Sequence, residues 1–516
     1  MRFNRACGTL VHPTSFPSKY GIGDLGTEAR EFLQFLTETR QSVWQILPLG
    51  PTGYGNSPYA SYSAFAGNPF LISPDILIEK GLLTKDEASK AILPSSTRVD
   101  YDTVFANKSA LFEKAYKRYE EQNGKAGGKD LKNFARKNTF WLKDYCLFTA
   151  CSEYYDRKPW NKWDQDIARR KPAAIKKAEK DLADRIRYHR WLQFEFYNQW
   201  LSLKETANKN GITIIGDIPI FVDHNSADCW AHSKYFEVDE IGNRLLVAGV
   251  PPDYFSATGQ LWGNPLYKWK ELKKDGYLWW IKRFEQMLVM VDAIRVDHFR
   301  GFDAYWEVKA EAKTAEHGRW VKGPGTDLFD TILKKLGELP IIAEDLGVIT
   351  SDVVYLRDKY DFPGMKILQF AWSDNAGNSF IPHNYNTSNC VVYTGTHDND
   401  TSRGWYDSAT DLEKHRLREY VRSACEKPEA ELIRLAMTSC ANQAIFPLQD
   451  LMGLGTEHRM NLPGTVENNW MWRYTHEMLE MIDKGSIRYL VELTNRDPKA
   501  KLQDANLVEL VTEEAN

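Results

Sequence analysis

The stretch Asp292-Ala-Ile-Arg295-Val-Asp297-His298 is a short apolar run that ends in charged residues. Similar runs recur along the chain. Most are rich in β-branched and aromatic residues and end near Gly, Pro, Asp or Asn, which is typical of buried strands. The clearest runs are residues 43–49, 68–72, 212–222, 292–296, 340–343, 365–371, 390–393 and 444–447.

Helical patterns separate these strand-like runs, and the clearest are residues 27–39, 272–290, 328–337 and 411–426. A chain that alternates strands with helices forms a parallel sheet. Eight strands favour closure of that sheet, and a chain of 516 residues fits a barrel enlarged by insertions. We therefore predict an α/β protein, a (β/α)8 TIM barrel with mainly helical insertions.

Residues 75–205 break the alternation because they are charged, helix-forming and poor in strand signals. They predict a mainly helical insertion subdomain that could cover one side of a cleft. Residues 1–74 would then start the catalytic barrel, and residues 206–516 would supply the remainder with the active-site loops. Residues 500–516 are expected to form a terminal helix with a polar tail.

Composition excludes several classes of protein. Lys and Arg total 66 against 70 Asp and Glu, so there is no strong basic excess of the kind that nucleic-acid binding needs. No apolar run has membrane-spanning length, and the first residues lack a secretory pattern. The seven cysteines are dispersed, and no Cys/His cluster has metal-ligand spacing. We expect a cytoplasmic protein with no cofactor, no metal, no nucleic-acid partner and no membrane association.

Four of the strand-like runs lead into a carboxylate, namely Asp217, Asp297, Glu344 and Asp398. A carboxylate at the end of a buried strand is costly unless it has partners or a solvent-filled cleft. In a barrel, the carboxyl ends of all strands meet on the face that carries active sites. A single Asp at a strand end is more often a helix N-cap, and periodicity alone leaves both interpretations open.

Converging carboxylates without histidine clusters favour glycoside chemistry. Cleavage with retention needs a nucleophilic carboxylate, a protonated carboxyl that acts on the leaving oxygen, and stabilisation of the positively charged transition state. Arg295 precedes Asp297 by two positions, so both side chains would share one face of a strand, and the arginine would keep Asp297 ionised. Aromatic residues in polar loops, such as Tyr54, Tyr59 and Trp262, suit the packing of sugar rings.

The string Gly21-Ile-Gly23-Asp-Leu-Gly26 matches the GxGxxG pattern of dinucleotide-binding proteins. A loop rather than a strand precedes it, and no ribose-binding acid follows at the end of a later strand. A tight turn before the helix at Thr27 is the simpler interpretation. A nucleotide-dependent oxidoreductase is therefore disfavoured.

Several strings resemble a known family. Arg295-Val-Asp297-His298-Phe-Arg300-Gly301, the run to Glu344 and Thr396-His397-Asp398-Asn399 look like signatures of the α-amylase clan. Longer matches at residues 51–69, 216–222, 249–265, 318–325 and 459–470 resemble the amylomaltases, which are the 4-α-glucanotransferases or disproportionating enzymes of glycoside hydrolase family 77. The resemblance covers nearly the whole chain, and these strings are specific.

The resemblance implies a reaction and three catalytic roles. The enzyme would transfer α-1,4-glucan segments from a donor to an acceptor glucan or glucose, with retention, through a covalent glucosyl-enzyme. Asp297 would be the nucleophile, Glu344 the general acid/base, and Asp398 the residue that stabilises the distorted, charge-developing sugar.

Further residues would bind substrate. Arg295, His298 and His397 would hold the same sugar ring, and Tyr59 and Asp217 would line the donor side. Residues 249–264 resemble the lid of the family over the acceptor sites and contain Gln260 and Trp262. Tyr54 is expected at a second glucan-contact surface, and Asn469 in the last matched string is a further substrate-binding candidate. Expected partners are small and polymeric α-1,4-glucans, and we expect a monomer or weak homo-oligomer.

Two alternatives remain from the sequence. A hydrolase of the same clan would share the carboxylates and differ in its products, because transfer requires that a bound acceptor and a closed lid exclude water. A non-catalytic glucan-binding protein would lack one or more of the three catalytic carboxylates, and all three are present.

Overall fold

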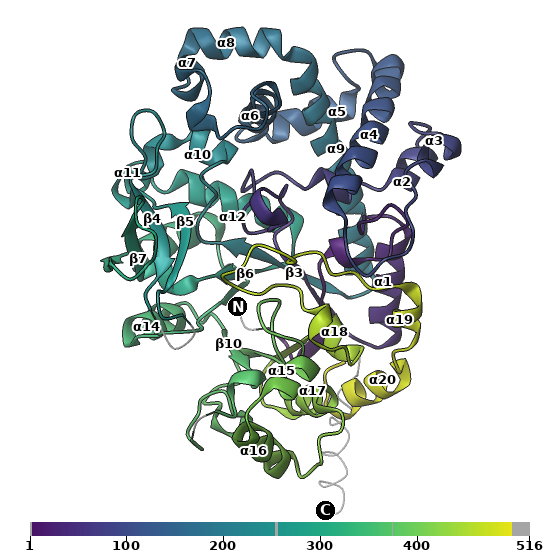
Figure 1. The fold of residues 1–516 in the computed structure, drawn as a ribbon, viewed down its shortest axis with the longest axis vertical. Helices are drawn as coiled ribbons and strands as arrows, with labels where there is room; N and C mark the ends of the chain where they lie inside the picture. The colour runs from purple at the N-terminus through teal and green to yellow at the C-terminus, as the bar shows by residue number, and fades with distance from the viewer. Residues whose placement is uncertain (1–2, 253–255, 374, 498–516) are drawn as a thin grey trace, which may run out of the picture.

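Eight parallel strands form a barrel at the centre of the molecule (Figure 1). The structure is a computed structural model that describes residues 3–252, 256–373 and 375–497, so the helix expected at residues 500–516 lies outside the described residues. The strands, in spatial order, are β10 (Gly364–Ile367), β11 (Cys390–Tyr393), β12 (Gln443–Pro447), β1 (Ala6–Leu10), β2 (Val43–Gln45), β3 (Thr213–Pro219), β6 (Ala293–Asp297) and β9 (Ile341–Ala343). A hydrogen bond from Ala343 N to Pro363 O (2.9 Å) joins β9 to the residue before β10. The predicted barrel fold is confirmed.

One of the eight predicted strands is wrong. Residues 68–72 form the 3₁₀ turn η3 (Pro69–Leu71), because Pro69 cannot donate to a sheet and the Asn68 side chain accepts from Phe70 N. The missing strand is β1, which is buried throughout. It contains Gly8, where a Cβ atom would lie only 1.9 Å from Val43 O of the neighbouring strand. Glycine is therefore required there, although it weakens the strand pattern in the sequence.

The predicted helices are largely present as α1 (Thr27–Glu38), α12 (Leu278–Met290), α13 (Gly325–Leu336) and α16 (Asp411–Val421). The helix expected at 272–290 is instead split into α11 (Trp269–Lys274) and α12. Gly276 and Tyr277 both adopt positive φ, at 68° and 57°, and so interrupt the helix. The GxGxxG string is a turn before α1, in which Asp24 Oδ1 accepts from Gly26 N.

A large helical region follows β2 and precedes β3, and Figure 1 shows most of it above the barrel. Its helices are α2 (Pro74–Glu79), α3 (Lys85–Ser89), α4 (Tyr101–Asn123), α5 (Lys129–Lys137), α6 (Leu142–Tyr154), α7 (Gln165–Ala168), α8 (Pro172–Asp181) and α9 (Ala183–Lys209). The longest, α9, leads directly into β3. We propose that residues 75–205 are the insertion subdomain that the sequence predicts.

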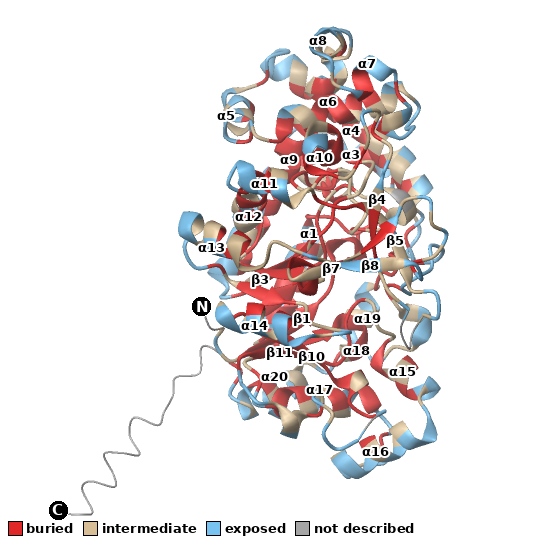
Figure 2. Ribbon diagram, turned by 90° about the vertical axis from the view of Figure 1, so that its left-hand side faces the viewer, coloured by how far each residue is buried: buried red, intermediate tan, exposed pale blue. Residues whose placement is uncertain are grey.

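The remaining α-helices all follow β3 in the chain: α10 (Ala227–Ala231), α14 (Ser351–Lys359), α15 (Ser402–Ser408), α17 (Pro428–Thr438), α18 (Leu448–Leu451), α19 (His476–Glu480) and α20 (Lys484–Leu493). Buried residues concentrate in the barrel strands, and exposed residues in the outer helices such as α16 (Figure 2). No helix in the described part of the chain is long and apolar enough to span a membrane.

A second, antiparallel sheet was not predicted from the sequence. It contains β4 (Leu246–Val250), β5 (Gln260–Pro265), β7 (Ala304–Lys309) and β8 (Gly318–Lys322), in the order β5-β4-β7-β8. Its strands come from the loops that follow β3 and β6, at the carboxyl ends of the barrel strands. The sheet thus brings β5, with Gln260 and Trp262, to the face of the barrel where active sites lie.

Candidate active site

Three of the four predicted carboxylates come from adjacent barrel strands. Asp217 lies in β3, Asp297 is the last residue of β6, and Glu344 follows β9 directly. Neighbouring strands are about 4.8 Å apart, so the ends of β6 and β9 bring Asp297 and Glu344 near each other, and after burial the charge of Asp297 is the largest cause that raises the pKa of Glu344. Asp398 follows β11, and only β10 lies between β11 and β9. Burial raises the pKa of Tyr59, and the charge of Asp398 adds to this effect.

Arg295 holds two of these carboxylates. Its guanidinium is buried and donates from Nη1 to Asp217 Oδ2 (2.6 Å), while Nη2 lies 3.0 Å from Asp297 Oδ1. Burial lowers the pKa of Arg295, but the two carboxylates outweigh this effect and raise it above its ordinary value. The ion pair with Arg295 therefore fixes the carboxyl group of Asp297 at the end of β6, and a carboxylate held in this way can act as a nucleophile.

The pKa of Glu344 is strongly raised. Burial and the nearby charge of Asp297 raise the pKa of Glu344 to about 8, against the smaller effects of Arg295 and two backbone donors. Those donors are Leu346 N to Oε1 (2.9 Å) and His298 N to Oε2 (2.8 Å). At neutral pH Glu344 is therefore protonated, as a general acid beside a nucleophilic carboxyl group must be.

The raised pKa of Glu344 predicts that kcat/KM falls at alkaline pH. Glu344 must be protonated to assist departure of the leaving group, so the rate should fall as pH rises through about 8. Initial rates of disproportionation between pH 4 and pH 10 would test this, and a rate that rises through pH 8 would contradict it.

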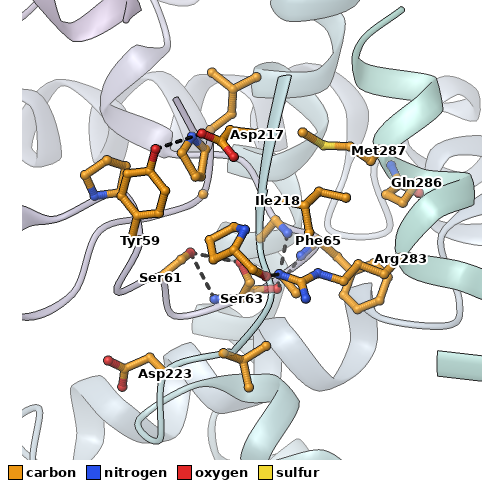
Figure 3. A pocket seen from close by; sticks show the side chains of 18 of the residues that line it. Tyr59, Ser61, Ser63, Phe65, Asp217, Ile218, Asp223, Arg283, Gln286 and Met287 are labelled. Atoms are coloured by element: carbon orange, nitrogen blue, oxygen red, sulfur yellow. Dashed lines mark hydrogen bonds between the residues drawn. The ribbon is translucent and has the colours of Figure 1, made fainter. Parts of the chain in front are cut away.

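Tyr59 contacts both Asp217 and His397. Its hydroxyl donates to Asp217 Oδ2 (2.8 Å), and Figure 3 shows this bond at the edge of a pocket that Ser61, Phe65 and Arg283 also line. The ring stacks on His397 with centroids 5.1 Å apart and an interplanar angle of 9°. Burial raises the pKa of Asp217 to about 7, and the Arg295 guanidinium opposes that rise.

Three buried polar atoms of the site have no hydrogen-bond partner within the described ranges. They are Asp217 Oδ1, His298 Nε2 and His397 Nδ1. Buried polar atoms are costly unless something pairs with them, and sugar hydroxyls can both donate and accept. Burial lowers the pKa of His298 to about 3, so its imidazole is neutral and can bond a hydroxyl. These atoms suit a polyhydroxylated ligand.

Trp262 is the part of the predicted lid that contacts the site. Its ring is 38% exposed and meets the His298 ring edge-on, with centroids 4.7 Å apart. Its Nε1 donates to Gln260 Oε1 (3.2 Å), so a hydrogen bond joins these two predicted residues. Residues 253–255 of the predicted lid lie outside the described residues.

For two other predicted residues, the structure gives the backbone position of Tyr54 and the side-chain contacts of Asn469. Tyr54 lies in the 3₁₀ turn η2 (Tyr54–Asn56), and its side chain is outside the described part. The Asn469 side chain bonds within its own loop, accepting from Leu462 N (2.9 Å) and donating to Thr465 O (2.9 Å). In this structure Asn469 shapes residues 459–470, and its described contacts do not include the carboxylates.

That loop contributes residues that sequence reasoning missed. Asn461 Nδ2 donates to Asp398 Oδ1 (2.7 Å), and Arg459 Nη2 donates to Asp398 O (2.5 Å). Trp470 packs on both Tyr59 and His397, with centroids 5.7 and 5.9 Å away. All three lie in the string 459–470 that carries the resemblance, but none lies at a strand end, where chemistry was sought.

The site is built from carboxylates, imidazoles and aromatic rings. Across the described residues, no group of three or more His, Cys, Asp or Glu side chains could hold a metal ion. The chemistry that these residues can perform is proton transfer and nucleophilic attack by carboxyl groups.

Comparisons with known proteins agree with this geometry. Residues 11–479 match the glycoside hydrolase family 77 profile, described as 4-alpha-glucanotransferase. The chain is 49% identical to the 4-alpha-glucanotransferase of Synechocystis sp., over 95% of this chain and 98% of that protein. It is 46% identical to the Thermus thermophilus 4-alpha-glucanotransferase, over 96% of this chain and 100% of that protein.

A solved structure gives the same result in three dimensions. The amylomaltase from Streptococcus agalactiae, solved in complex with acarbose, is 40% identical to this chain and superposes with a TM-score of 0.92. The match covers 95% of this chain and 99% of that one. Family profile, sequence relatives and structure agree over almost the full length, and the chain belongs to the 4-alpha-glucanotransferases of glycoside hydrolase family 77.

Proposed function

We propose that this enzyme transfers α-1,4-glucan segments from a donor glucan to an acceptor glucan or glucose by retaining double displacement. One observation carries the mechanism: Glu344, whose pKa is raised to about 8, lies one strand from Asp297, which is paired with Arg295. Family membership supports the reaction class. The relatives named above support an α-glucan as the substrate.

In the first step, Asp297 attacks the anomeric carbon and the glycosidic bond breaks. Glu344 gives its proton to the departing oxygen, so a neutral glucan leaves and a covalent glucosyl-enzyme remains. In the second step, Glu344 takes a proton from the acceptor hydroxyl, whose oxygen displaces Asp297. Two inversions at one carbon restore the original α configuration.

The surrounding residues would act on the sugar between these two acids. Asp398, fixed by Asn461, would stabilise the positive charge that develops on the ring. Asp217, His298 and His397 would bond its hydroxyls through their unpaired atoms, and Tyr59 would keep Asp217 in place. Preorganised groups of this kind favour the transition state because they need no rearrangement as charge develops.

The direct test uses maltotriose as the only substrate and follows chain lengths and free glucose over time. Transfer predicts a ladder of longer glucans together with glucose, and little increase in reducing ends. Net growth of reducing ends without longer products would identify a hydrolase of the same clan. A Glu344→Gln control shows whether the activity belongs to this site.

Trp262 should govern the balance between transfer and hydrolysis. Because its exposed side chain packs edge-on against His298, removing it should let water compete with the acceptor for the glucosyl-enzyme. We expect Trp262→Ala to raise the ratio of hydrolysis to transfer, measured as new reducing ends per transfer event with maltotriose. Trp320→Ala, which removes an equally exposed tryptophan on β8, is the control. An unchanged ratio in Trp262→Ala would refute the role.

Three expectations from the sequence remain predictions: a cytoplasmic location, a monomer or weak homo-oligomer, and a second glucan-contact surface at Tyr54. The second surface can be tested by measuring the activity of Tyr54→Ala on short and long glucans, because loss of a remote contact would affect only the long ones.

A further inference from the structure

A buried carboxylate that the proposed mechanism does not use lies close behind the Asp398 loop. Asp450 belongs to α18, which follows β12 directly, and only 2% of its surface is exposed. Burial raises the pKa of Asp450 to about 6, against the lowering effect of its hydrogen bonds. A charge buried in this way needs strong partners, and the identity of those partners indicates what the residue does.

Those partners come from both ends of one loop. Asp450 Oδ2 accepts from Thr394 Oγ1 (2.6 Å) and from Ser402 Oγ (2.6 Å), and Oδ1 accepts from Ser402 N (2.7 Å). Thr394 is the residue after β11, and Ser402 is the first residue of α15. A single carboxylate therefore ties the start of the loop to its end.

The loop between these two anchors carries His397 and Asp398. Its middle has its own contacts, from Asn461 and Arg459 to Asp398 and from Gln369 and Thr456 to Asp400, whereas Asp450 is the group that joins its two ends. Catalytic groups work only when held to within about 0.5 Å, and a displacement of about 1 Å can cost 10²-fold in rate. A loop that is fixed at both ends has far fewer conformations than one fixed at a single end.

We propose that Asp450 is a positioning residue that fastens Thr394 to Ser402 and thereby sets the place of His397 and Asp398. The inference rests on the proposed function, because it assigns Asp398 a role in the reaction. Asp450 does not touch the substrate in this account. It acts through the loop, and its effect is on the geometry of the two residues that do.

A matched control exists elsewhere in the chain. Asp24 is also buried, accepts from Ser18 Oγ (2.8 Å) and Gly26 N (2.9 Å), and lies before α1 in the first part of the chain. Ser18→Ala and Ser402→Ala each remove one hydroxyl donor from a buried aspartate. A purely structural role predicts that both variants behave alike.

The experiment compares Thr394→Val, Ser402→Ala and Ser18→Ala in the full-length enzyme, measuring Tm, kcat and KM with maltotriose. We expect all three to lower Tm by similar amounts. Thr394→Val and Ser402→Ala should lower kcat about tenfold with little change in KM, whereas Ser18→Ala should keep kcat within about twofold. Equal kcat for Ser402→Ala, Thr394→Val and Ser18→Ala would overturn the proposal.

Two variants of Asp450 separate geometry from charge. Asp450→Ala removes all three bonds and should lower kcat about 10²-fold. Asp450→Asn can keep the arrangement, because its carbonyl can accept from Ser402 N while its amide group donates to the two hydroxyls, which accept as well as donate. Asp450→Asn should therefore restore most of kcat. If it is as inactive as Asp450→Ala, the charge matters rather than the positioning, and the proposal is wrong.

A measurement without turnover keeps this inference distinct from the proposed function. Amide hydrogen exchange of residues 394–402 should be faster in Asp450→Ala than in the unaltered enzyme, with no change at residues 18–26. Unchanged exchange would overturn the positioning role even if transfer activity is established. Absence of transfer by the unaltered enzyme would instead contradict the proposed function.

Discussion

Replacing Asp297 by asparagine should lower kcat/KM for maltotriose disproportionation by roughly 10⁴-fold or more, because the loss of a covalent nucleophile removes the reaction path itself. The amide has almost the same shape, but it is neutral and a poor nucleophile. It also leaves the buried Arg295 with one carboxylate fewer, since Asp297 Oδ1 now lies 3.0 Å from its guanidinium. Steady-state rates with maltotriose measure the effect.

The control for this variant lies at the other end of the same strand. Asp292 Oδ2 accepts from Ile214 N (2.8 Å) and Asn208 Nδ2 (2.8 Å), next to the start of β6. Asp292→Asn also removes a charge beside β6, but far from the carboxyl end of the barrel, and should keep activity within a few-fold. Comparable losses in both variants would mean that the effect comes from the strand and not from the nucleophile.

Replacing Glu344 by glutamine should lower kcat/KM for maltotriose by about 10²–10⁴-fold, the usual contribution of a general acid. Fluoride departs from a glucosyl fluoride without needing a proton, so the first step should survive with that donor. If Glu344→Gln is equally slow with both donors, Glu344 is not the acid.

The same variant should change how stability depends on pH. The pKa of Glu344 in the folded protein is raised to about 8 from an ordinary value of 4.5, so the folded state binds the extra proton between these values. Stability from this group is therefore present below about pH 4.5 and is lost as pH rises through 8. Glu344→Gln should remove that loss, so its Tm should exceed that of the unaltered enzyme at pH 8.5. A lower Tm at that pH would contradict the raised pKa.

Much of the barrel could be predicted from the sequence because its strands are buried on both faces. Seven of the eight expected runs coincide with barrel strands, since parallel strands form continuous apolar runs. The exception, residues 68–72, shows the limit of that signal, because Pro69 and the Asn68 side chain turn an apolar run into a 3₁₀ turn. The strand that replaced it, β1, depends on close packing at Gly8.

The candidate site was partly predictable for a related reason. Asp217, Asp297 and Glu344 were found because they stand at the carboxyl ends of strands, where a barrel brings them together. Asn461 and Trp470 reach the site from a long loop, which has no periodic pattern. Asp450 was missed because its role depends on hydrogen bonds to Thr394 and Ser402, and these contacts exist only in three dimensions.

The central claim is that Asp297 becomes covalently linked to the sugar. Glu344→Gln incubated with α-maltotriosyl fluoride should form a maltotriosyl-enzyme and resolve it slowly, so that the linked form accumulates. Digestion and mass spectrometry should then find the maltotriosyl adduct on the peptide that contains Asp297. An adduct on another residue, or release of fluoride with inverted product and no adduct, would contradict the double-displacement mechanism.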